Sequence, residues 1–301
     1  MTTHAELLDG LVFPEGIRWH DGRLWFSDIH TGRVLAVDPD DGRVEVVAEL
    51  DDDYPSGLGF LPDGSLLVAA IRTKTIRRVA DGRVTVHSDL SGYGGDFIND
   101  MVTDADGRTY VGTRPAMGSA VVDGGDTVLL VHPDGRSEVA ATGVTAPNGM
   151  VVTADGATYL VAETHAGVIT AFDRLPGGRL GDRRTYATLP SGTPPDGICL
   201  DDHGAVWAAT GFGGVCLHLD DRGRVTARVP ALDGRWMLAC VVGGRDRGTL
   251  FMATIETTME GVATLDGPGS RGHADHDRWV RSLSAGWIEQ VPLDLAEASA
   301  P

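Results

Sequence analysis

Phe13-Pro14-Glu15-Gly16 opens a phrase that returns along this chain and decides its fold. The later copies are Tyr54-Pro55-Ser56-Gly57, Phe97-Ile98-Asn99-Asp100, Ala146-Pro147-Asn148-Gly149 and Pro194-Pro195-Asp196-Gly197. A sixth, less faithful copy begins near Leu238-Ala239. The third letters of the first five copies are 41, 43, 49 and 48 residues apart. A repeat at such a period indicates one supersecondary unit used several times.

Each repeat contains four short stretches of alternating apolar and polar residues. Turns such as Pro62-Asp63-Gly64 and Asp202-His203-Gly204 separate these stretches, as expected for antiparallel hairpins. Helical periodicity is nearly absent, and residues 4–8 form the one short helical candidate. Six units of four strands predict an all-β, six-bladed β-propeller with four-stranded blades that spans residues 1–301 as a single domain. A sandwich or a pair of barrels would not explain a repeat of this length.

The two ends of the chain are expected to close the ring together. The last strand, residues 286–293, has no unit after it, so we expect it to complete blade six with residues 7–11 and to leave no open sheet edge. Residues 114–126 and 254–278 are long and rich in glycine, and we expect loops over one face. Within the second, we expect residues 273–277 to form a mobile polar loop rather than a metal site, since no rigid element holds their two histidines.

Composition limits which kinds of partner and which cellular location we expect for this protein. The 301 residues carry a formal net charge of −18, which argues against binding to nucleic acid or to an anionic membrane. We therefore expect a small-molecule partner, while the oligomeric state stays open. Cys199, Cys216 and Cys240 lie in apolar runs without metal-site spacing, so we expect them in the core. Without a signal-peptide pattern or a membrane-length apolar run, a cytoplasmic location is expected.

The third letter of the repeated phrase predicts a site. Each copy begins an innermost strand, and innermost strands of a propeller begin at one end of the central channel. Glu15, Asn99, Asn148 and Asp196 should therefore form one ring around the axis, although any one of them alone could be an ordinary turn residue. Two carboxylates and two amide oxygens suit one divalent cation in the central channel, namely Ca²⁺, Mg²⁺, Mn²⁺ or Zn²⁺. Four protein ligands would leave positions open for water or substrate, as in catalytic metal sites.

The same topology predicts the rim of the pocket. The first strand of a blade leaves the face that bears the ring and the second returns to it, so loops between second and third strands should surround the site. Candidate substrate contacts in these loops are Arg72, Arg114, His165 and Phe212. For each alone, a solvated loop residue is the simpler interpretation.

Several motifs together resemble the senescence marker protein 30/gluconolactonase family, also called regucalcin-like. They are Phe13-Pro14-Glu15-Gly16, Asn99-Asp100 with Asp104 and residues 106–113, Pro147-Asn148-Gly149-Met150, residues 195–201, 206–209 and 243–246. The resemblance spans nearly the whole chain. It implies a six-bladed propeller with one divalent ion, and commonly the hydrolysis of sugar lactones or other small esters. It assigns metal binding to Glu15, Asn148 and Asp196, makes Asn99 a further ligand or substrate contact, and makes Asp196 the catalytic base.

One position departs from the animal members of that family. They have a substrate-binding Arg two residues before the Asn of the second motif, whereas this chain has Phe97, a candidate substrate contact. The change favours a less polar lactone or a natural-product intermediate over gluconolactone.

The mechanistic hypothesis is metal-assisted hydrolysis of a lactone or small ester. The cation would polarise the carbonyl, and Asp196 would act as general base for water. No GxSxG motif supports a serine hydrolase. Two alternatives remain open at this point. The metal pocket could serve isomerisation, dehydration or cyclisation in secondary metabolism, or the propeller could be a non-catalytic ligand-binding platform, which would have no need of a polar ring.

Overall fold

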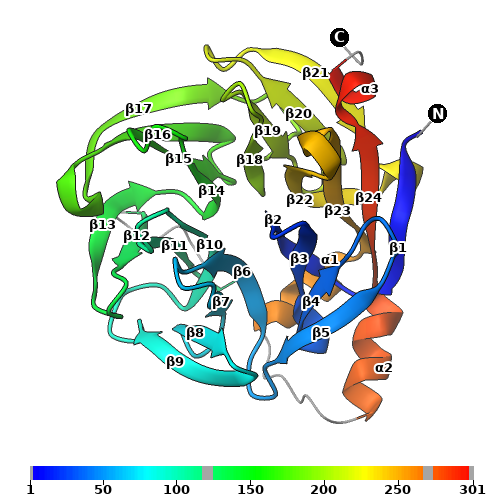
Figure 1. The fold of residues 1–301 in the computed structure, drawn as a ribbon, viewed down its shortest axis with the longest axis horizontal. Coiled ribbons are helices and arrows are strands. Elements are labelled where there is room, and N and C mark those ends of the chain that lie inside the picture. Colours follow the sequence, from blue (N-terminus) through cyan, green and yellow to red (C-terminus); the bar gives the residue numbers. More distant parts are fainter. Residues whose placement is uncertain (1–2, 117–124, 267–273, 298–301) are drawn as a thin grey trace.

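The computed structural model describes residues 3–116, 125–266 and 274–297. Six four-stranded antiparallel sheets surround a central axis, and each is one blade of a β-propeller (Figure 1). Contacts between the innermost strands of successive blades run around the ring and return from β22 to β2. The expected all-β, six-bladed propeller is therefore confirmed.

The blades follow one another along the chain, each from its innermost to its outermost strand. Blade one contains β2 (Pro14–His20), β3 (Arg23–Asp28), β4 (Arg33–Val37) and β5 (Val44–Glu49). Blade two contains β6 (Pro55–Phe60), β7 (Leu66–Ala70), β8 (Thr75–Ala80) and β9 (Arg83–Asp89). Blade three contains β10 (Phe97–Thr103), β11 (Thr109–Arg114), β12 (Asp126–Val131) and β13 (Ser137–Val144).

The later blades repeat this order. Blade four contains β14 (Pro147–Val152), β15 (Thr158–Glu163), β16 (Val168–Arg174) and β17 (Leu180–Thr188). Blade five contains β18 (Ile198–Leu200), β19 (Val206–Ala209), β20 (Val215–Leu219) and β21 (Val225–Pro230). Blade six contains β22 (Trp236–Gly243), β23 (Thr249–Thr257), β24 (Ser284–Pro292) and β1 (Ala5–Leu11). Short 3₁₀ turns lie at η1 (Ile29–Thr31), η2 (Pro176–Gly178), η3 (Leu232–Gly234) and η4 (Arg245–Arg247).

Strand β1 closes the ring as the outermost strand of blade six. It pairs antiparallel with β24, with Ala5 opposite Gln290 and Leu8 opposite Ile288. The expected joint completion of blade six by both chain ends is confirmed. The helical candidate over residues 4–8 is wrong, because a sheet edge nearly three hundred residues away offers this segment strand hydrogen bonds.

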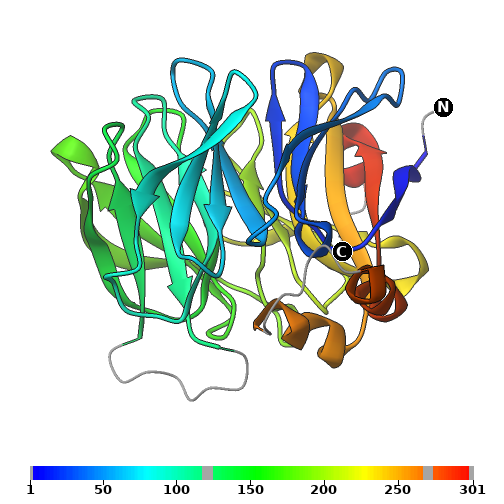
Figure 2. The same ribbon diagram turned by 90° about the horizontal axis from the view of Figure 1, so that it is seen from below.

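Helices occupy the long segment of blade six that was expected to be a loop. After β23 the chain forms α1 (Met259–Ala263), η5 (Thr264–Asp266) and α2 (Ala274–Leu283), and the short α3 (Leu293–Glu297) follows β24. The Thr258 hydroxyl caps α1 by accepting from the Gly261 amide at 3.1 Å. In Figure 2, α1 and α2 lie on one side of the ring. The loop prediction for residues 254–278 is therefore wrong where the chain is described.

Two smaller expectations fall in the long segments. His273 of the polar cluster lies outside the described residues, and Ala274 begins α2, so the expected polar loop is wrong from that residue onward. In the other segment, β11 runs through Arg114 and β12 begins at Asp126, while residues 117–124 lie outside the described part.

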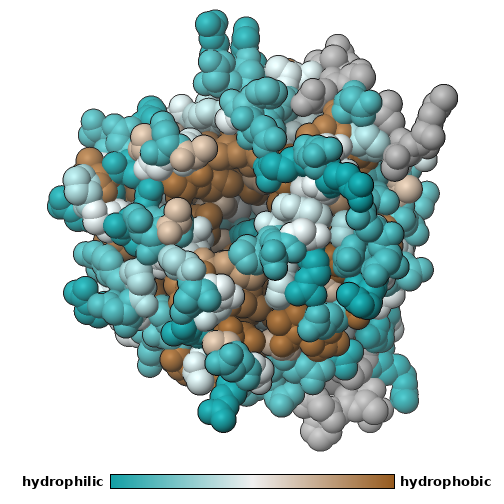
Figure 3. Space-filling model, viewed as in Figure 1, coloured by the Kyte–Doolittle hydropathy of each residue, from teal (hydrophilic) through white to brown (hydrophobic). Residues whose placement is uncertain are grey.

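The core lies between adjacent blades, where apolar residues of neighbouring sheets interdigitate. The contact between blades five and six buries Trp207 and Met237 together with Cys199, Cys216 and Cys240. All three cysteines are buried and their thiols are free, which confirms them as core residues. The face seen in Figure 3 is hollowed at the centre of the ring, with apolar side chains in the hollow and hydrophilic ones on the blades around it. No helix among the described residues is long and apolar enough to cross a membrane.

A buried carboxylate joins the closing elements of blade six. Glu289 of β24 accepts hydrogen bonds from Thr254 at 2.8 Å, from the Leu232 amide at 3.1 Å and from Arg235 at 3.3 Å, and its other partner is His4 at 2.8 Å. Burial alone would raise the pKa of Glu289, but the hydrogen bonds outweigh it and lower that pKa. The carboxylate thus stabilises the closed blade in its ionised form.

Glu289→Gln should lower the free energy of unfolding by about 3 kcal/mol at pH 7, because it removes the buried charge that Arg235, Thr254 and His4 contact and leaves Arg235 only its more exposed partners Glu6 and Asp233. The matched control is Glu45→Gln, which removes an exposed ion pair with Arg23 and should cost at most about 1 kcal/mol. Urea unfolding measures both. The folded-state pKa of Glu289 lies below its ordinary value of 4.5, so its contribution is complete above that pH and disappears as pH falls through the lowered pKa. Equal losses in the two variants would contradict this role.

Candidate functional site

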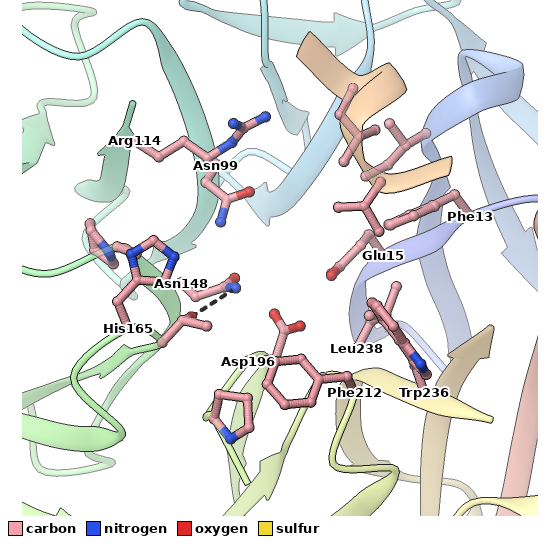
Figure 4. Close-up of a pocket in the computed structure, with 18 of the residues that line it drawn as sticks. Phe13, Glu15, Asn99, Arg114, Asn148, His165, Asp196, Phe212, Trp236 and Leu238 are labelled. Carbon is pink, nitrogen blue, oxygen red and sulfur yellow. Dashed lines mark hydrogen bonds between the residues drawn. The ribbon is translucent and has the colours of Figure 1, made fainter. Parts of the chain in front are cut away.

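A cavity of about 320 Å³ lies on the propeller axis, at the end of the channel where the innermost strands begin (Figure 4). This end is opposite to the face seen in Figure 3. The described residues that line it are Phe13, Glu15, Ile29, Ile71, Asn99, Arg114, Ala146, Pro147, Asn148, Thr164, His165, Pro194, Asp196, Gly211, Phe212, Trp236, Leu238, Met259, Val262 and Leu265.

The four predicted polar residues meet in this cavity. Glu15, Asn99 and Asn148 lie near the starts of β2, β10 and β14, and Asp196 lies just before β18. Figure 4 shows their side chains directed into one common space. Leu238 of β22 takes the equivalent place in blade six and also lines the cavity. The polar ring is thus interrupted by an apolar side chain.

Glycines that follow the ring positions let neighbouring blades approach closely. A Cβ added to Gly149 would lie 2.4 Å from the Ile198 nitrogen and 2.5 Å from the Asp196 carbonyl oxygen. The Gly149 amide uses this proximity to donate a hydrogen bond to the Asp196 carbonyl at 3.1 Å. Gly197 repeats the arrangement one blade on, since its amide donates to the Leu238 carbonyl at 2.8 Å. The repeated glycine therefore determines how close successive ring residues can be.

Hydrogen bonds orient two of the ring side chains. The Asn148 amide nitrogen donates to the Thr164 hydroxyl at 3.3 Å, and that hydroxyl donates to the Pro195 carbonyl at 2.8 Å. This contact uses the nitrogen of Asn148 and leaves its amide oxygen for the cavity. One Glu15 oxygen accepts from the Gly16 amide at 2.8 Å. In contrast, Asp196 Oδ1 is buried and has no hydrogen-bond partner within the protein.

Burial and like charge perturb both carboxyl groups. Burial, followed by the neighbouring Asp100 carboxylate, raises the pKa of Glu15 to about 8. Burial, followed by Glu15 and Asp100, raises the pKa of Asp196 well above its ordinary value. Arg18 pairs with Asp100 at 2.8 Å and provides a counter-charge there. A buried, orphaned carboxylate oxygen beside a second carboxylate fits a bound cation, because a cation supplies the missing partner and reverses these shifts.

The composition of the ring limits the kind of ion it would fit. Among the described residues, no three His, Cys, Asp or Glu side chains form a metal-binding group. The donors here are two carboxylates and two amides, all oxygen ligands, which suit a hard divalent cation.

Three of the five predicted substrate contacts line the cavity. Arg114 is the last residue of β11, whereas His165 and Phe212 lie in the loops between the second and third strands of their blades, and all three line the cavity. Phe97 and Arg72 are not among the lining residues. The Phe97 ring lies under the Arg114 guanidinium at 4.7 Å, and Arg72 lies over the ring of Tyr54 at 5.8 Å.

Several lining residues were not anticipated from the sequence. Phe13 and Trp236 precede the ring positions of their blades by two residues, as Ala146 and Pro194 do, so the repeat could have identified them. Met259, Val262 and Leu265 come from α1 and η5, outside the repeat. Nothing in the periodic pattern could have placed those three at the cavity.

A closed six-bladed propeller with a polar ring at one end of its channel defines the class of this protein. The chain belongs to the family described as the SMP-30/Gluconolactonase/LRE-like region, whose profile matches residues 13–256. The resemblance inferred from the motifs is thereby confirmed.

The similarity to individual relatives extends over most of the chain. It is 30% identical to pentonolactonase XacC of Haloferax volcanii over 87% of this chain and 85% of that protein. It is 27% identical to 6-deoxy-6-sulfogluconolactonase of Pseudomonas putida over 81% and 83% of the two chains. The structure of a gluconolactonase from Xanthomonas campestris has a TM-score of 0.71 at 24% identity, covering 95% of this chain and 88% of that one, which shows a shared fold.

Gly149→Ala should destabilise the protein by about 1–3 kcal/mol, because the added methyl group would overlap the backbone of the next blade at the ring. Gly92→Ala is the matched control, since its Cβ would meet nothing within 4 Å. Thermal and urea unfolding measure both. Equal stability of the two variants would contradict the close approach of blades four and five.

Proposed function

We propose that this protein hydrolyses a lactone at a site that contains one divalent cation held by Glu15, Asn148 and Asp196, with Asn99 as a further ligand. The observation that carries the proposal is the buried Asp196 carboxyl, which shares the cavity with the Glu15 carboxyl and whose Oδ1 has no hydrogen-bond partner within the protein. Two carboxylates give the ring a charge that matches one divalent ion. The similarity to the pentonolactonase and the sulfogluconolactonase supports lactone hydrolysis as the reaction class.

Each group at the site would have a separate role in hydrolysis. When bound, the cation would act as a Lewis acid toward the lactone carbonyl. In this proposal Asp196 accepts a proton from water as that water adds to the carbonyl carbon. The bond between the carbonyl carbon and the ring oxygen then breaks, the ring oxygen takes a proton, and a hydroxy acid leaves. Asn148, oriented by Thr164, presents its amide oxygen to the same space.

Asp196→Asn should lower kcat/KM at least about 100-fold, because the general base and one charged ligand are lost together. Treatment with EDTA should abolish turnover, and addition of Ca²⁺, Mg²⁺, Mn²⁺ or Zn²⁺ in turn should identify the ion that restores it. Arg72→Ala is the control and should keep wild-type turnover, since Arg72 does not line the cavity.

Metal binding is measured separately by equilibrium dialysis with Mn²⁺. Glu15→Gln and Asp196→Asn should both weaken binding, whereas Arg72→Ala should not. Full lactonase activity in EDTA, or in Asp196→Asn, would overturn the proposed site.

A further inference from the structure

An apolar belt lies directly beside the polar ring. The residue two places before each ring position is Phe13, Tyr54, Phe97, Ala146, Pro194 or Trp236, and none of the six carries a charge. Phe13, Ala146, Pro194 and Trp236 line the cavity. The rings of Tyr54 and Phe97 are instead covered by the guanidinium groups of Arg72 and Arg114. A substrate whose reacting carbonyl reaches the ring must therefore lay its body against apolar side chains.

The mouth of the cavity continues the apolar surface. Phe212 is 61% exposed and Met259 is 63% exposed, and both line the cavity. The Phe212 ring lies edge-on to Trp236 with their centroids 5.9 Å apart. Val262 and Leu265 of the inserted α1 and η5 complete this side, where the orange segment borders the cavity in Figure 4. Exposed apolar side chains gathered at the mouth of a cavity are typical of a ligand-binding surface.

Few polar groups outside the ring could bind substrate hydroxyls. Among the described lining residues they are Arg114, Thr164 and His165. Arg114 is paired with Asp266 at 2.8 Å, and the Thr164 hydroxyl already donates to the Pro195 carbonyl. The Arg114–Asp266 pair also joins blade three to the insertion of blade six beside the cavity. A polyhydroxylated ring would bury hydroxyls without enough partners, and such groups cost free energy.

We propose that this cavity selects lactones with an apolar alkyl or aryl substituent over polyhydroxylated sugar lactones. The lactone carbonyl lies at the polar ring, and the substituent packs against Trp236, Phe212 and Met259. This inference rests on the proposed function and names its substrate class. This substrate class differs from the sugar lactones after which the two relatives are named.

The first test compares kcat/KM for three lactones with the metal-loaded wild-type protein. They are δ-decanolactone, which carries a pentyl chain, unsubstituted δ-valerolactone, and glucono-δ-lactone. Each methylene buried against the wall should contribute about fourfold, so δ-decanolactone should exceed δ-valerolactone at least about tenfold. Glucono-δ-lactone should be the poorest of the three. Equal or better turnover of glucono-δ-lactone would overturn the inference.

The second test locates the subsite. Trp236→Ala should lower kcat/KM for δ-decanolactone about tenfold or more while changing that for δ-valerolactone less than about threefold. Met259→Ser, at an exposed position, should shift the same ratio in the same direction if Trp236→Ala fails to fold. Trp279→Ala is the matched control, because Trp279 of α2 is exposed and does not line the cavity. Equal losses for both substrates would overturn the subsite.

The third test separates selectivity from catalysis. The lactam analogues, in which NH replaces the ring oxygen, resist hydrolysis, and their binding is followed by calorimetry. The pentyl lactam should bind at least about tenfold more tightly than the unsubstituted lactam or the gluconolactam. If no lactone turns over, the proposed hydrolysis fails, yet this binding series still decides the inference. Tighter binding of the gluconolactam would overturn it.

Discussion

The site depends on how closely the innermost strands of neighbouring blades can approach one another. Gly16 and Gly57 bring blades one and two against the next blade in the manner of Gly149 and Gly197, with virtual Cβ contacts of 2.5 Å to the Ser56 carbonyl oxygen and 2.4 Å to the Met101 nitrogen. The residue before each of these glycines is a ring position. The ring is therefore narrow because the residue after each of these four ring positions is a glycine, which has no side chain.

This close approach has an electrostatic consequence. It places Glu15 and Asp196 in one buried space and adds Asp100, which takes the glycine place in blade three. Placing carboxylates in such a site costs free energy, since burial and like charge both disfavour their ionised forms. The packing of six blades supplies the free energy that holds them there. Arg18 compensates Asp100 and also donates to the Leu58 carbonyl, so the ring retains two carboxylates for another cation.

The sequence predicted the propeller and the ring because one repeated phrase encodes both. Its proline and glycine fit the strand start and the blade contact, and its third letter faces the channel. Orientations set across blades could not be predicted in this way. Phe97 has the same place in its repeat as Phe13, but the Arg114 guanidinium covers it, and Arg72 lies over Tyr54 instead of entering the cavity. The strand over residues 5–11 and the helices after β23 also lie outside the repeat, so the period of the repeat could not predict their secondary structure.

The two parts of the cavity therefore have different structural origins. The ring comes from the starts of the innermost strands, where the blade contact constrains every backbone atom. The wall combines Trp236, at the start of β22, with residues of rim loops and of the segment between β23 and β24, where length and composition can change without disturbing a blade. The Arg114–Asp266 pair, with each side chain less than 15% exposed, connects β11 of blade three to the segment between β23 and β24. A propeller built in this way can keep its reaction chemistry while the insertion alters which molecule reaches it.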